Sequence, residues 1–221
     1  MSIHAKLSAP LALTDMPEDI RGWQEGDADV RLRLWRWWGP MVEPNKWLTW
    51  IMLNPSTADS VKNDPTLLRI IAFTHRWGFT GLRVHNVYPF RTPSPKELGK
   101  IVLGWDERQD WWVRDEIHRN HQRIAKDLIT NDAAMVAWGS PAGGLGGDTE
   151  LWIESLFDTI NDPDGPRLST LKLWSIGLTA SGAPKHPMAR GLHRVPNDAS
   201  PVRFKNPGTV SFGDDDEKDA A

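Results

Sequence analysis

The sequence predicts a three-layer α/β/α fold around a central, mostly parallel sheet, with an antiparallel hairpin at one edge. Short apolar runs typical of buried strands alternate along the chain with stretches of helical periodicity, the order expected of α/β proteins. The 221 residues are enough for one domain with a sizeable core. We therefore expect a single domain over residues 29–205, an N-terminal arm over 1–28 and an acidic, disordered tail over 206–221.

The first half of the expected domain contains three strands and one helix. Residues 31–37 alternate in polarity, as a half-exposed strand does, and the apolar run 47–53 follows at hairpin distance. A helix over 64–78 begins with an N-cap aspartate followed by proline and ends at a glycine. The next strand, 82–88, leads into a proline-rich loop.

The second half repeats the alternation of helix and strand. A long helix is expected within 106–129, followed by a buried strand over 133–138. The glycine-rich segment 139–147 lacks the Lys-Ser/Thr of a phosphate-binding loop, which favours a flexible loop. A short helix over 150–160 and a strand over 171–178 complete the pattern, and the composition beyond them is typical of loops.

Composition excludes several classes of protein. The chain has no cysteine, so it holds no disulfide, thiolate zinc site or iron–sulfur cluster. No apolar run reaches the ~18 residues of a membrane span, and no signal-peptide layout is present, so a cytoplasmic location and no membrane partner are expected. Five acids and one base lie in residues 214–219. The rest of the chain is therefore close to neutral, and any nucleic-acid contact depends on a local basic patch.

Two turns that follow apolar runs are the strongest candidates for a functional site. Asn54 and Pro55 follow a run ending at Leu53, and His186 and Pro187 lie shortly after another run. Proline stops each strand and fixes the backbone, which holds the polar side chain in place. Since ligands bind at the carboxyl ends of parallel strands, these side chains are expected to face one small molecule. Taken singly, each is more typical of an ordinary turn.

Metal binding and nucleophilic catalysis are less strongly indicated by the sequence. His118 and His121 are spaced three residues apart on the long helix, a pair more typical of a solvated helix face than of metal ligands, and we expect no metal and no cofactor. Ser56 and Ser140 do not occupy a nucleophile-elbow sequence.

A basic stretch follows the His186 turn. It includes Arg190, His193 and Arg194, whose charge suits a phosphodiester backbone. Scattered surface cations on a C-terminal loop are an equally good interpretation.

Residues 47–192 resemble the bacterial and phage family catalogued as domain of unknown function 1643. The matching motifs are Leu-Asn-Pro-Ser-Thr-Ala-Asp over 53–59, Asn-Asp-Pro-Thr over 63–66, Arg-Trp-Gly over 76–78, the strand containing Asn86, Trp138-Gly139, and Gly-x-Pro-x-His-Pro over 182–187. The resemblance implies no established activity.

The order of four motifs is also similar to that of the uracil-DNA glycosylase superfamily. They are Met-Leu-Asn-Pro over 52–55, Val-His-Asn-Val over 84–87, Val-Ala-Trp-Gly-Ser over 136–140, and Lys-His-Pro-Met-Ala-Arg over 185–190. This resemblance implies a glycosylase-like fold and an enzyme that hydrolyses the N-glycosidic bond of a non-standard or modified base in nucleic acid, DNA rather than RNA. Arg190 stands where those enzymes carry a leucine that enters the DNA helix.

The resemblance also implies residue roles. Catalysis is assigned to Asn54, which orients water, and His186, which stabilises the departing base. Asp59 is expected to assist because it is a nearby carboxylate, not because of the resemblance. The residues assigned to the substrate are Pro55, Ser56, Thr57, Asn86, Trp138 and Gly139. Contacts to the nucleic-acid backbone are assigned from the charge of the basic stretch, to Arg190, His193 and Arg194. Two other functions stay open: a module that binds a modified base without cleaving it, and an enzyme acting on free nucleosides.

Overall fold

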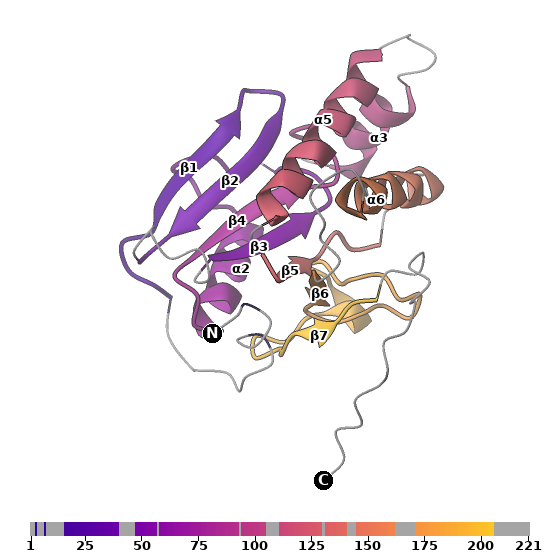
Figure 1. The fold of residues 1–221 in the computed structure, drawn as a ribbon. Coiled ribbons are helices and arrows are strands. Elements are labelled where there is room, and N and C mark those ends of the chain that lie inside the picture. The colour runs from indigo at the N-terminus through magenta and orange to yellow at the C-terminus, as the bar shows by residue number, and fades with distance from the viewer. Residues whose placement is uncertain are drawn as a thin grey trace.

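A seven-stranded sheet forms the centre of the computed structural model (Figure 1). The structure describes residues 3, 7, 16–39, 47–56, 58–92, 94–104, 111–129, 131–140, 145–161 and 171–205. The strands of these residues are β1 (Arg21–Gly26), β2 (Arg31–Trp37), β3 (Trp47–Met52), β4 (Gly81–Asn86), β5 (Ala133–Val136), β6 (Lys172–Ser175) and β7 (Val202–Arg203). Their spatial order is β1-β2-β4-β3-β5-β6-β7.

The four central strands, β4, β3, β5 and β6, run parallel, so their carboxyl ends meet at one edge of the sheet. The outer strands β1, β2 and β7 pair antiparallel. The predicted mixed α/β fold with a mostly parallel sheet is confirmed. The implied likeness to the glycosylase fold is not tested by this topology.

The edge hairpin consists of β1 and β2, and the expected pairing of residues 31–37 with 47–53 is wrong. All six residues of β3 are buried, as in a strand with neighbours on both sides, and β3 lies between the parallel strands β4 and β5. The half-exposed β2 pairs instead with β4, with Leu34 opposite Val84.

Residues 21–26, which lie in the segment expected as an N-terminal arm, form β1 at the edge of the sheet. Cross-strand pairs hold it to β2: the rings of Trp23 and Trp35 lie 5.2 Å apart, and Glu25 accepts a 2.6 Å hydrogen bond from Arg33. These contacts compensate for weak alternation in the sequence. The acidic tail over 206–221 lies outside the described residues.

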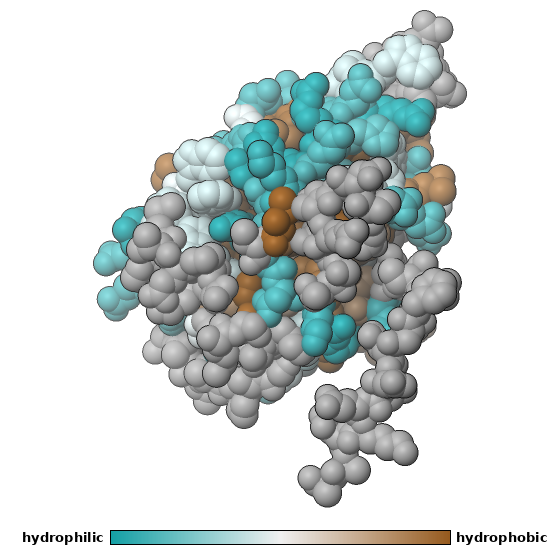
Figure 2. Space-filling view, viewed as in Figure 1, coloured by the Kyte–Doolittle hydropathy of each residue, from teal (hydrophilic) through white to brown (hydrophobic). Residues whose placement is uncertain are grey.

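Helices cover both faces of the sheet. They are α2 (Pro65–Arg76), α3 (Pro95–Leu103), α5 (Trp111–Leu128) and α6 (Gly146–Asn161), with a short 3₁₀ turn, η2 (Gly191–His193). One hydrophobic cluster packs α2 against one face, and a second packs α3, α5 and α6 against the other. The outward side of α5 presents mainly hydrophilic side chains (Figure 2). None of the helices in the described ranges combines the length and apolarity that a bilayer-spanning helix requires.

Helix starts follow their local chemistry. The side chain of Asp64 accepts a 2.7 Å hydrogen bond from the amide of Leu67, which confirms the predicted N-cap of α2. The α3 helix, absent from the sequence prediction, begins in the same way, with Ser94 as N-cap and Pro95 in the first turn. The predicted short helix starts earlier than expected, at Gly146, and the long helix is described from Trp111.

Candidate functional site

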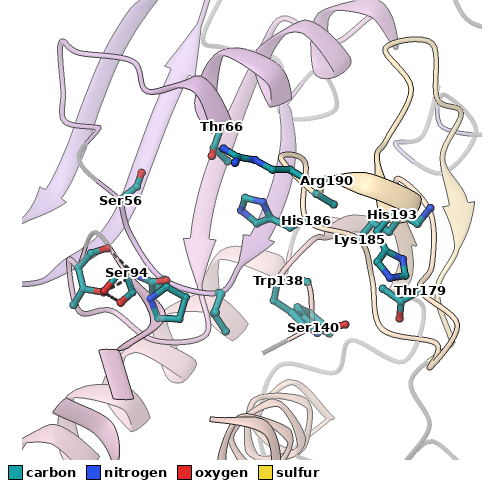
Figure 3. Close-up of a pocket in the computed structure, with 16 residues that line it drawn as sticks. Ser56, Thr66, Ser94, Trp138, Ser140, Thr179, Lys185, His186, Arg190 and His193 are labelled. Carbon is teal, nitrogen blue, oxygen red and sulfur yellow. Dashed lines mark hydrogen bonds between the residues drawn. The ribbon is translucent and has the colours of Figure 1, made fainter. Parts of the chain in front are cut away.

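A cavity of about 450 Å³ opens beyond the carboxyl ends of β3, β5 and β6 (Figure 3). We call it the outer cavity. Its lining residues are Leu53, Asn54, Ser56, Thr66, Thr92, Ser94, Pro95, Trp138, Gly139, Ser140, Thr179, Lys185, His186, Ala189, Arg190 and His193. A smaller space of about 50 Å³, the inner recess, adjoins it on the α2 side and shares four of these residues, Asn54, Ser56, Thr66 and His186.

Asn54 is fixed so that its amide oxygen stays available. Its Nδ2 donates to the carbonyl of Thr92 at 3.2 Å, to the Thr92 hydroxyl at 3.1 Å and to the carbonyl of Pro55 at 3.1 Å. The Thr92 hydroxyl in turn donates to the carbonyl of Ser94. Among the described residues, Asn54 Oδ1 has no donor, so it can accept from a water or from an N–H of a ligand.

Asn86 lies at the last position of β4, opposite Met52 of the parallel strand β3. Only 1% of its surface is exposed, and it lines the inner recess. Its Nδ2 has no hydrogen-bond partner among the described residues. A buried amide donor without a partner costs about 1–3 kcal/mol, so its presence needs an explanation.

Two buried residues of α5, which sequence reasoning missed, hold the backbone next to Asn86. Asn120 Nδ2 donates to the Asn86 carbonyl at 2.7 Å, and His121 Nε2 contacts the Val87 carbonyl at 3.1 Å. The expectation that His118 and His121 form a solvated face is wrong for His121, which is fully buried. Burial lowers the pKa of His121 to about 4, so the ring is neutral at pH 7 and Nε2 donates to the carbonyl.

His186 presents one free nitrogen to the outer cavity. Its Nδ1 accepts a 3.1 Å hydrogen bond from the amide of Met188, so in the neutral ring the proton is on Nε2. Burial lowers the pKa of His186, while the charge of Asp64 opposes this effect. The ring projects from the loop after β6 into the cavity (Figure 3). Its Nε2–H is therefore a donor to an oxygen of a ligand.

Gly139 allows the His186 turn to approach the end of β5. Its φ is +78°, and a Cβ at this position would lie 3.1 Å from the Cβ of His186. The Gly139 amide donates to the carbonyl of Pro184 at 3.0 Å, which ties the two segments together. Gly139 thus acts on the site through backbone geometry.

The structure brings Asn54 and His186 together, as their turns after apolar runs led us to expect, and Asn86 joins them. All three line the inner recess. Two of them, Asn54 and His186, also line the outer cavity, whereas Asn86 lies behind it. Their catalytic and binding roles stay predictions.

Asp59, expected to assist catalysis, lines neither the outer cavity nor the inner recess. Its Oδ1 accepts from the amides of Val61 and Lys62 at 2.8 and 2.7 Å, and these bonds lower its pKa. It organises the loop before α2 instead. The carboxylate at the recess belongs to Asp64, which is occupied by its helix amide and by the hydroxyl of Ser56.

The remaining predicted residues divide into those at the cavity and those beside it. Ser56, Trp138 and Gly139 line the outer cavity, and Trp138 is 5% exposed, packed edge-on against aromatic rings. Pro55 is buried beside the cavity and is not part of its lining. Thr57 lies outside the described residues.

The rim of the outer cavity is basic. Arg190 and His193 line it as predicted, Lys185 joins them unpredicted, and Arg194 does not line it. No aspartate or glutamate is among the described lining residues. No group of three or more His, Asp or Glu side chains in the described ranges is arranged to hold a metal ion. The rim therefore favours an anionic ligand.

Comparison with known proteins gives one match. The family described as "Protein of unknown function (DUF1643)" matches residues 31–188. Searches of curated proteins and of solved structures find no match, and nothing in them supports the resemblance to uracil-DNA glycosylases. Since the match covers more than half of the chain, the protein belongs to the DUF1643 family.

Proposed function

We propose that the outer cavity binds a nucleotide unit of nucleic acid and that the protein hydrolyses the N-glycosidic bond of a non-standard or modified base. One observation carries the proposal: an amide acceptor, Asn54 Oδ1, and two N–H donors, from Asn86 and His186, are unpartnered at one recess. Heterocyclic bases present donors and acceptors of this kind along one edge, and binding sites use a few convergent polar groups to orient a ligand.

The basic rim supports a phosphate-bearing ligand over a neutral nucleoside. Lys185 and Arg190 line the outer cavity without a carboxylate among the described lining residues. Their charge attracts a phosphodiester backbone at a distance from the recess that the base edge faces. A cavity of about 450 Å³ lies within the range of small-molecule sites, ~300–1,000 Å³.

Glycosidic cleavage leaves negative charge on the departing base, and His186 is suited to stabilise it. The Nε2–H of the neutral ring donates to a base oxygen. Removing one such donor from comparable oxyanion sites costs ~3–4 kcal/mol of transition-state stabilisation. Asn54 Oδ1 has two lone pairs, so it can accept from the base and also orient the attacking water. An amide is not a general base, so a good leaving base is required.

The test uses oligonucleotides carrying uracil, hydroxymethylated or bulkier pyrimidines, with released base and gel shift scored separately. The proposal expects release that is abolished in His186→Ala and Asn54→Ala. Asp59→Ala serves as matched control, since Asp59 is in the same loop but lines neither cavity. Absence of release from every oligonucleotide refutes the proposed hydrolysis.

A second candidate, binding of a modified base without cleavage, is favoured by the state of the carboxylates. Asp59 lines neither the outer cavity nor the inner recess, and both oxygens of Asp64 accept hydrogen bonds from protein donors. No described carboxylate at the recess is thus free to activate water. A gel shift without release identifies this function, and turnover of nucleosides alone identifies an enzyme on free nucleosides.

A further inference from the structure

A buried arginine lines the inner recess without an ion pair. Arg31 of β2 is 3% exposed, and no carboxylate of the described residues forms a salt bridge with it. Its Nη1 donates to the carbonyl of Ala58 at 2.7 Å, and its Nε has no partner among these residues. The carboxylates of Asp64 and Asp59 attract the guanidinium without bonding to it, so its spare donor is left for an acceptor that is supplied from outside the chain.

Arg36, on the same strand, shows that burial alone does not leave a guanidinium unsatisfied. It is 1% exposed, and it donates to Asn63 Oδ1 at 2.7 Å and to the carbonyls of Trp35, Asp59 and Lys62. Arg36 does not line the recess. Of these two buried arginines, Arg31 lines the recess, and it is the one that has an unpaired N–H donor.

The recess has a second spare donor, and its described lining includes one carboxylate, Asp64. Asn86 Nδ2 is unpartnered there. The carboxylate of Asp64 already accepts from Ser56 and from the amide of Leu67. Burial lowers the pKa of Arg31 to about 10, which still leaves the guanidinium charged at pH 7.

We propose that the inner recess binds a carboxylate group of the ligand, held by Arg31 and Asn86, while the rest of the ligand occupies the outer cavity. The recess, at about 50 Å³, exceeds the ~10–15 Å³ that one water needs and is far smaller than the outer cavity. Guanidinium and carboxylate form short, charge-assisted hydrogen bonds. This inference rests on the proposed function. Under that function, the ligand is a base with a substituent that carries the carboxylate.

The experiment compares two nucleotides that differ in one group. Binding of 5-carboxy-2′-deoxyuridine 5′-monophosphate and of thymidine 5′-monophosphate, which has a methyl in place of the carboxylate, is measured by calorimetry. The carboxylated nucleotide is expected to bind about 10- to 100-fold more tightly, the range of a hydrogen bond to a charged group. The preference should disappear in Arg31→Gln and persist in Arg36→Gln, the equally buried control. Equal affinities in the wild-type protein overturn the proposal.

A second measurement needs no variant, because Arg31 also holds a loop and its replacement can prevent folding. Formate, a free carboxylate, should compete with the carboxylated nucleotide and leave the affinity for thymidine monophosphate unchanged. Formate that affects the binding of both nucleotides equally, or of neither, contradicts a carboxylate subsite.

The outcomes also separate the two proposals. Preference for the carboxylated nucleotide without release of base from oligonucleotides refutes the proposed hydrolysis and leaves the carboxylate subsite standing. Equal release of base from carboxylated and methylated oligonucleotides refutes the carboxylate subsite and leaves the proposed hydrolysis standing.

Discussion

Protonation of His121 should destabilise the protein between pH 6.5 and pH 4. The ring is buried and neutral, with a pKa of about 4 in the folded protein against the ordinary 6.5 expected after unfolding. In this window the unfolded chain binds more protons than the folded one, so stability falls as the pH falls. At 1.36 kcal/mol per pKa unit, going from pH 7 to pH 4 costs about 3 kcal/mol from this residue.

The assay is urea denaturation of wild type and His121→Gln at pH 7 and pH 4. Glutamine keeps a donor for the Val87 carbonyl and does not titrate. The loss of unfolding free energy on acidification should be smaller in the variant by about 3 kcal/mol, against a typical total stability of ~5–15 kcal/mol. Other groups titrate in both proteins and cancel. Equal losses in the two proteins refute the neutral, buried state of His121.

Three further outcomes are expected. Gly139→Ala should weaken nucleotide binding, because the added methyl meets the Cβ of His186 and the backbone is strained at φ +78°; unchanged affinity in calorimetry contradicts this coupling. Asp64→Ala should cost about 1 kcal/mol or more of stability in thermal unfolding through loss of the α2 cap, with Asp59→Ala as a second loop variant that leaves this cap intact. Base release should be constant from pH 8 down to below 6.5 and then decline, because His186 has a lowered pKa and acts as a neutral donor; a maximum at acidic pH indicates that the imidazolium is the active form.

The fold could be predicted from the sequence wherever the residue pattern of a single element determines its position in the fold. The uniformly apolar run of β3 predicts a central strand, and the Asp64-Pro65 pair predicts the start of α2. The pairing of β2 with β4 could not be predicted from the sequence, because it depends on which of the parallel strands lies next to the edge hairpin. β1 was missed because cross-strand pairs with β2, and not its own alternation, hold it in place.

The candidate site was accessible in part. Parallel strands end at one edge, so the polar residues of the two turns after apolar runs were expected to meet, and Asn54 and His186 do line one recess, together with Asn86. His121 had a usable signal: it shares helical spacing with Ile117 and Ile124, both fully buried.

Arg31 had no such signal. In an alternating strand it is typical of a solvent-facing position, and its burial depends on the loop before α2, which lies over it through the Ala58 carbonyl. Loop placement of this kind is set by tertiary contacts that no local pattern encodes.

The central claim is that three distant side chains bind one ring. A crystal structure of the protein soaked with a pyrimidine nucleotide tests it most directly. We expect the base edge within hydrogen-bond distance of Asn54 Oδ1, Asn86 Nδ2 and His186 Nε2, with the phosphate beside Arg190. A nucleotide bound elsewhere, or a base that contacts none of the three, contradicts the account.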